Sequence, residues 1–150
     1  MLIKSILVAV DGSENSDRAL DFALDLGEKY NAAVTVLNVS EFPAMGVVPQ
    51  EPTAYSGGSM AVFSKDLRKF HEEILSKAVA RAKAIKPDLA ISSKLREGEP
   101  ASEIVDAAKE GSFDVIVVGH KGVSRVRELF LGSVSEKVAH LAPCPVIIVR

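Results

Sequence analysis

Aliphatic runs recur along the chain, and the segments between them carry apolar residues at helical spacing. The aliphatic runs are rich in β-branched residues and end at turn residues, which predicts strands. The expected strands cover residues 3–10, 33–39, 90–97, 115–118 and 146–149, and the expected helices cover 16–30, 61–86, 100–109 and 134–141. Ser13 and Ser16 both qualify as the N-cap of the first helix.

The second helix is expected to be long and amphipathic, and Pro87 should end it. Its expected inward stripe consists of Leu67, Phe70, Ile74, Leu75, Ala78, Ala82 and Ile85.

Strands and helices alternate from one end of the chain to the other, which predicts an α/β fold with one doubly wound parallel sheet of five strands and helices on both faces. Right-handed crossovers leave a few doubly wound strand orders. We expect the order 3-2-1-4-5, which places the first and fourth strands side by side. In such sheets a ligand binds beyond the carboxyl ends of the strands, where the order reverses. The turns after residues 10 and 118 should therefore meet at the binding site.

The segment after the fourth strand reads GHKGVSRVRELFLGS and leads into the last helix. A buried strand, a glycine-bearing turn and a helix N-terminus together favour phosphate binding, because backbone N–H groups and the helix dipole face the anion. Gly119, Gly122 and Gly132 are expected to let the main chain approach closely with positive φ. Ser133 is expected at the helix start, where its hydroxyl can cap the helix or touch a phosphate oxygen.

Residues 41–60 interrupt the regular pattern with three prolines and three glycines. The segment leaves from the same edge of the sheet as the glycine turn. Either a lid over the ligand or a disordered insertion fits a loop of this length.

The composition is that of an ordinary globular protein of one domain, residues 1–150, with a formal net charge of −2. This charge does not favour nucleic acid or an acidic membrane as a partner. The single cysteine, Cys144, excludes an intramolecular disulfide and fits a reducing compartment. No apolar run is long enough for a membrane helix and no signal peptide is evident, so we expect a cytoplasmic protein.

With these features the chain resembles the ATP-binding type of the universal stress protein family over nearly its whole length. ILVAVDGSENSDRAL is similar to the family's first strand, acidic turn and first helix, and the glycine loop fits the family's pattern G-x2-G-x9-G-[ST]. The resemblance implies that Ala9, Val10, Asp11 and Val39 lie against the adenine and ribose. It further implies that the ribose and phosphates are surrounded by Gly119, Gly122, Gly132, Ser133, Val134 and Ser135.

Other polar residues near the loop are weaker candidates. His120 lies between two of the glycines and is a candidate nucleotide contact, although an exposed loop histidine is the safer interpretation. Lys121, Arg125 and Arg127 could reach phosphates or remain solvated. His71 and His140 are expected in helices away from the site. No grouping of His, Cys, Asp and Glu has metal-ligand spacing, so a Mg or Mn ion would come with the nucleotide.

The family resemblance implies an ATP-binding regulatory protein in a stress response. An AMP- or ADP-binding sensor without turnover and a ligand-free dimeric interaction protein stay open as alternatives. Whether the protein is an enzyme is uncertain, and at most slow ATP hydrolysis is expected. Neither the phosphate-loop signature nor a positioned catalytic base is evident, and we assign no catalytic residue.

The last strand, residues 146–149, is an edge strand in the expected order and consists of four aliphatic residues. An apolar edge with unpaired backbone groups is a pairing surface that soluble proteins cover. We therefore expect a homodimer in which two copies of this strand pair across a two-fold axis, an arrangement that the family resemblance also implies.

Overall fold

The computed structural model describes residues 2–41, 59–121 and 132–150, and for residues 59–63 it describes the backbone only. The five strands are β1 (Ser5–Ala9), β2 (Ala33–Ser40), β3 (Ile91–Glu97), β4 (Val115–Gly119) and β5 (Val146–Val149). The helices are α1 (Glu14–Tyr30), α2 (Ser59–Ile85), α3 (Pro100–Glu110) and α4 (Ser133–Leu141). The predicted elements are thus confirmed, with shifts of a few residues at their ends.

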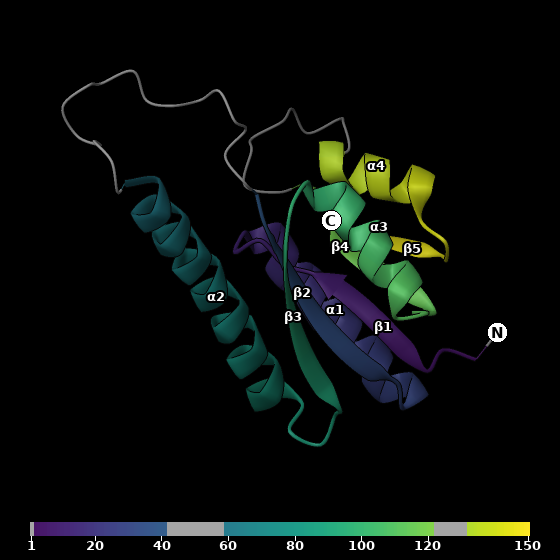
Figure 1. Cartoon of the computed structure of the whole chain (residues 1–150). Coiled ribbons are helices and arrows are strands. Elements are labelled where there is room, and N and C mark those ends of the chain that lie inside the picture. Colours follow the sequence, from purple (N-terminus) through teal and green to yellow (C-terminus); the bar gives the residue numbers. More distant parts are fainter. Residues whose placement is uncertain (1, 42–58, 122–131) are drawn as a thin grey trace.

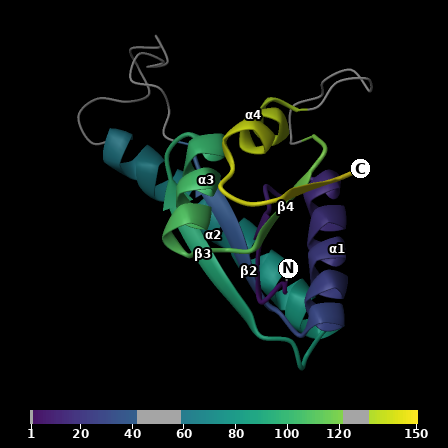
Figure 2. The ribbon, with the colours of Figure 1, turned by 90° about the vertical axis from the view of Figure 1, so that its right-hand side faces the viewer.

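The strands form one parallel sheet in the order β3-β2-β1-β4-β5, so the predicted topology is confirmed. α1 and α2 cover one face and α3 and α4 cover the other (Figure 1). Figure 2 shows the same layers from the side, with α1 on one side of the sheet and α3 and α4 on the other. The helices therefore lie on both faces, as expected.

The central position of β1 in the sheet explains why residues 6–9 are all aliphatic. Ile6 and Val8 point toward α1 and α2, whereas Leu7 points toward α3 and α4, and all three side chains are fully buried. A strand that is buried on both faces has no polar side to alternate with.

The predicted inward stripe of α2 is only partly correct. Leu75, Ala78 and Ala82 are buried against the sheet, but Phe70 is 57% exposed and Ile85 is 46% exposed. Phe70 lies five positions before Leu75, which places it well away from the buried stripe at helical spacing. Ile85 is the last residue of the helix, just before the turn that leads into β3.

Two hydrogen-bonded caps fix the starts of α1 and α3. Ser13 is the N-cap of α1, and its hydroxyl accepts the Ser16 N–H at 3.2 Å. Glu99 is the N-cap of α3, and its carboxylate accepts the N–H groups of Ala101 and Ser102. The Glu99 carboxylate also accepts from Lys137 Nζ at 3.0 Å, which ties α3 to α4.

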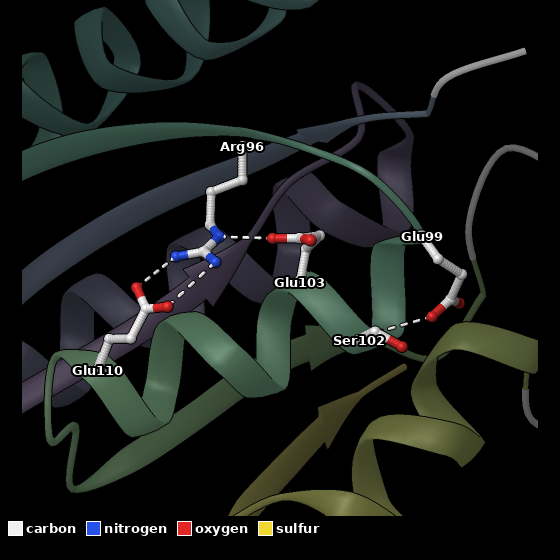
Figure 3. Close-up of polar contacts among 5 residues, drawn as sticks. All are labelled: Arg96, Glu99, Ser102, Glu103 and Glu110. Carbon is white, nitrogen blue, oxygen red and sulfur yellow. Dashed lines mark hydrogen bonds and ion pairs between the residues drawn. The ribbon is translucent and has the colours of Figure 1, made fainter.

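Arg96 attaches β3 to α3 (Figure 3). Its Nε donates to Glu103 at 2.7 Å, and its Nη1 donates to Glu110 at 2.6 Å. The guanidinium therefore spans two carboxylates on one face of the helix.

Glu99→Gln should lower the free energy of unfolding by roughly 0.5–1 kcal/mol at pH 7, because the cap loses its charge and its contact with Lys137 becomes weaker. Hydrogen bonding from Ser102, with a smaller contribution from Lys137, lowers the pKa of Glu99 from 4.5 to about 2. A carboxylate with a lowered folded-state pKa stabilises the fold above its unfolded pKa and loses this effect as the pH falls through the folded pKa.

The stability difference between wild type and Glu99→Gln should therefore shrink between about pH 4.5 and pH 2. Urea denaturation at several pH values measures it. Glu97→Gln is the matched control, since the exposed Glu97 has no side-chain hydrogen bond or ion pair within the described ranges. A difference that does not change with pH would contradict this assignment.

Candidate functional site

The carboxyl ends of β1 and β4 lie side by side, as the predicted strand order requires. Val8 is the register partner of Val117, so the turn after β1 and the turn after β4 leave the same edge of the sheet next to each other. β2 ends beside β1 at this edge, because Ala9 pairs with Leu37. The candidate residues on these three strands are therefore gathered where the strand order reverses.

The turn after β1 is closed by its own polar groups. The Ser13 N–H donates to Asp11 Oδ1 at 2.9 Å, and the Asp11 N–H donates to the buried Ser16 hydroxyl at 3.2 Å. Gly12 has φ +85°, a conformation that L side chains rarely adopt. Asp11 Oδ2 has no hydrogen-bond partner in the described part of the chain and stays available as an acceptor.

The start of α4 closes back onto the end of β4. The Gly132 N–H donates to the His120 carbonyl at 2.9 Å, and the buried Ser135 hydroxyl donates to the carbonyls of His120 and Gly132. Gly132 is the N-cap of α4 and provides no side-chain cap. Within the described part of the chain, no side chain therefore caps the first N–H groups of the helix.

The expected positive φ is wrong for both described glycines of the loop. Neither Gly119 nor Gly132 has positive φ, and Gly132 has φ −63° with extended ψ. Ser133 lies at the helix start, as expected, and is the exposed first residue of α4. The N-cap is Gly132, so Ser133 does not cap the helix.

The glycines are instead explained by close packing. A Cβ at Gly119 would lie 2.9 Å from the backbone C and O atoms of Asn15 in the first turn of α1. A Cβ at Gly132 would lie 3.2 Å from the His120 carbonyl oxygen and 3.3 Å from Lys121 Cα. The absence of a side chain lets both helix starts approach the end of β4.

His120 is buried rather than exposed, with 7% of its surface accessible. Its N–H donates to the Val149 carbonyl at 2.7 Å, so its backbone connects β4 to β5 as well as to α4. Burial lowers the pKa of the His120 imidazole, and the positive charges of Arg150 and Lys121 lower it further. The ring is therefore neutral at pH 7.

The remaining candidates on β1, β2 and α4 are distributed over the two faces of the sheet. Val10 is buried on the α1–α2 face, whereas Ala9, Val39 and Val134 are half-buried on the α3–α4 face. The Val10 N–H donates to the Leu37 carbonyl at 2.8 Å.

Sequence reasoning missed two polar residues at this edge. Asn38 is 1% exposed, and its Nδ2 donates to the Val10 carbonyl at 2.7 Å. His71 of α2 lies with Nδ1 2.7 Å from Asn38 Oδ1, so the expectation that His71 lies away from the site is wrong. An asparagine inside the apolar run VTVLNV was the signal for Asn38, because strands rarely bury asparagine without a specific partner. No sequence pattern indicates the pairing with His71.

Several of the predicted features lie outside the described residues or away from this edge of the sheet. Gly122, Arg125 and Arg127 lie outside the described residues, as does nearly all of the 41–60 segment.

Cys144 is half-buried, and burial raises the pKa of its thiol. Within residues 2–41, 59–121 and 132–150, no group of three or more His, Cys, Asp and Glu could hold a metal ion. None of the helices in the described ranges is long and apolar enough to cross a membrane.

A doubly wound parallel sheet with a glycine turn and a helix start at its switch point is the architecture of nucleotide- and anion-binding α/β proteins. Residues 2–150 match the sequence model of the Universal stress protein family. Universal stress protein YxiE of Bacillus subtilis is 34% identical over 154 residues, an alignment that covers 99% of this chain and 100% of that protein. The chain belongs to the universal stress protein family.

Two solved structures of similar proteins carry nucleotides. A universal stress protein in complex with cAMP is 27% identical, with a TM-score of 0.69, and the match covers 100% of this chain and 99% of that one. The universal stress protein from Archaeoglobus fulgidus in complex with dAMP is 28% identical, with a TM-score of 0.64 and full coverage of both chains.

Gly119→Ala should destabilise the protein by about 1–3 kcal/mol without any ligand, because its methyl group would overlap the backbone of Asn15. Gly132→Ala should lower the free energy of unfolding less, because the nearest atom to its Cβ would be 3.2 Å away instead of 2.9 Å. Its φ of −63° also suits alanine. Urea denaturation of the ligand-free variants measures both effects. Equal stability of Gly119→Ala and wild type would show that α1 does not approach β4 this closely.

Proposed function

We propose that this protein is a regulatory ATP-binding protein that holds the nucleotide at the carboxyl ends of β1, β2 and β4. The nucleotide changes its state or its choice of partner in a stress response. The observation that carries this proposal is the backbone of Val39, whose N–H and C=O have no β1 partner among the described residues, on the strand next to the one that Asp11 follows.

Odd-numbered residues of β2 direct their backbone groups toward β1, as the bonds from Ala33 N–H to Lys4 O and from Val10 N–H to Leu37 O demonstrate. The last of these ladder bonds in the described structure ends at Leu37. The next odd residue, Val39, therefore presents one N–H donor and one C=O acceptor at the open edge. Adenine offers the complementary pair, a ring nitrogen that accepts and an amino group that donates, whereas guanine offers the reverse.

The ribose and phosphates have matching groups on the neighbouring elements. Asp11 Oδ2 accepts from a ribose hydroxyl without disturbing the bond from the Ser13 N–H to Oδ1. The start of α4, where Gly132 provides no side-chain cap, offers N–H groups and the positive end of the helix dipole to the phosphates. The half-buried side chains of Ala9, Val39 and Val134 supply apolar walls. The residues present therefore fit an adenine nucleotide.

An AMP- or ADP-binding sensor is the second candidate. The solved structures of two similar proteins favour it, because the nucleotides named for them, cAMP and dAMP, each carry a single phosphate. Among the described residues, Asp11 after β1 and the exposed Glu41 after β2 are the carboxylates that follow the strands of this site, and neither is hydrogen-bonded to a nucleophilic side chain. ATP turnover is therefore expected to be slow at most, and any Mg or Mn ion would arrive bound to the phosphates.

We further propose a homodimer through β5. The carbonyls of Pro145 and Val149 accept from Ile116 and His120 of the β4 side. The backbone groups of the intervening residues Val146 and Ile148 therefore point outward from the edge. A second copy of this strand would satisfy them across a two-fold axis.

ATP should raise the melting temperature of the wild type, with about 2.7 kcal/mol of stabilisation when the ligand is at 100 times its Kd. Gly132→Val should abolish this shift, because its side chain pushes the start of α4 away from residues 120–121. Differential scanning fluorimetry with ATP, AMP and adenosine measures the effect, and the melting temperature of the ligand-free variant checks its folding. A full shift in the folded variant would contradict the proposed phosphate site, and an equal affinity for AMP and ATP would favour the sensor.

Ile148→Pro should shift the protein from dimer to monomer, because proline lacks the outward N–H while the ladder to β4 keeps its bonds. Ile148→Ala is the matched control, since it loses the same side chain but keeps the N–H. Sedimentation velocity at tens of micromolar protein distinguishes them. A monomeric wild type would rule out the dimer, and equal dissociation of both variants would rule out backbone pairing at Ile148.

A further inference from the structure

The hydrogen-bond ladder between β1 and β2 ends one bond before its register requires. In this register the Val39 N–H would be the next donor to the Val10 carbonyl, after the bond from the Val10 N–H to Leu37 O. The Val10 carbonyl instead accepts from the Asn38 side chain at 2.7 Å. Within the described residues, an asparagine amide thus occupies the place of a backbone donor.

The orientation of this amide is fixed from its other end. Asn38 Oδ1 lies 2.7 Å from His71 Nδ1, and an amide oxygen can only accept, so His71 Nδ1 carries the proton. Asn38 is 1% exposed with His71 in place, and His71 is the one partner of its oxygen among the described residues. His71 is half-buried, and burial is the main cause that lowers its pKa, so the ring is neutral at pH 7 and donates through Nδ1.

α2 is held in position for this contact. Ile74, one turn after His71, packs against Gly12, where an added Cβ would lie 3.5 Å from Ile74 Cδ1. Further along the helix, Arg81 pairs with Asp21 of α1 at 2.7 Å. His71 therefore approaches Asn38 from a helix that is anchored to the turn after β1 and to α1.

We propose that His71 is a positioning residue for base selection: it holds the Asn38 amide on the Val10 carbonyl and so keeps the Val39 N–H and C=O open to adenine. This inference rests on the proposed adenine site. Without the His71 donor, the Asn38 amide is free to rotate away. The Val39 N–H then pairs with the Val10 carbonyl, and the donor that distinguishes adenine from guanine is lost.

The test compares full-length wild type with His71→Ala, His71→Asn and Glu73→Ala by calorimetric titration with ATP and with GTP. Asparagine places an amide N–H near the position of histidine Nδ1, and Glu73 is an exposed residue of the same helix. His71→Ala should weaken ATP binding by about five- to tenfold, the cost of one neutral hydrogen bond, and change GTP binding little. His71→Asn should restore the wild-type ratio of ATP affinity to GTP affinity, and Glu73→Ala should leave this ratio unchanged.

Amide hydrogen exchange of the ligand-free proteins supplies a second readout. The Val39 amide should exchange quickly in wild type and more slowly in His71→Ala, because the ladder then gains a bond. General destabilisation would instead speed exchange. An unchanged ATP-to-GTP ratio in His71→Ala, or a Val39 amide that is already protected in wild type, would overturn the positioning role alone. A wild type that binds neither nucleotide would overturn the proposed function and this inference with it.

Discussion

The parallel pairing of β1 with β2 on one side and with β4 on the other is the constraint on which the rest of the structure depends. Because β1 is buried on both faces, its side chains fix where α1 and α2 pack and where α3 and α4 pack. Its register also decides which backbone groups remain unpaired at the carboxyl edge. The core and the candidate site are thus consequences of the same hydrogen-bonded arrangement.

The glycines of the loop illustrate how a binding motif can also be a packing motif. Gly119 lets the first turn of α1 lie against the end of β4, and Gly132 lets α4 begin within hydrogen-bonding distance of His120. Two helix starts consequently converge on one edge of the sheet. The motif therefore matters to the fold itself, independently of any ligand contact that these residues make.

Most of the fold could be predicted from the sequence, because aliphatic runs such as Val115–Val118 and the helical stripe of α1 have clear periods. Handedness and alternation restricted the strand order to a few doubly wound topologies, and the expected one is the one observed. Predictions failed where the outcome depends on how closely separate helices and strands pack, and not on the pattern of apolar residues along one of them. The φ of Gly132, the burial of His120 and the contact between His71 and Asn38 all depend on how separate elements pack, and no local period encodes this.

The two halves of the candidate edge come from opposite ends of the chain. Val8 of β1 is the register partner of Val117 of β4, although more than half of the chain lies between them. Contacts of such long range are slow to form, because the intervening chain must first be ordered. During synthesis, β1 and β2 emerge early and remain without the β4 neighbour until most of the protein has been made. A nascent or truncated chain that stops before β4 therefore carries Asp11 and Val39 but cannot assemble the edge against which α4 closes.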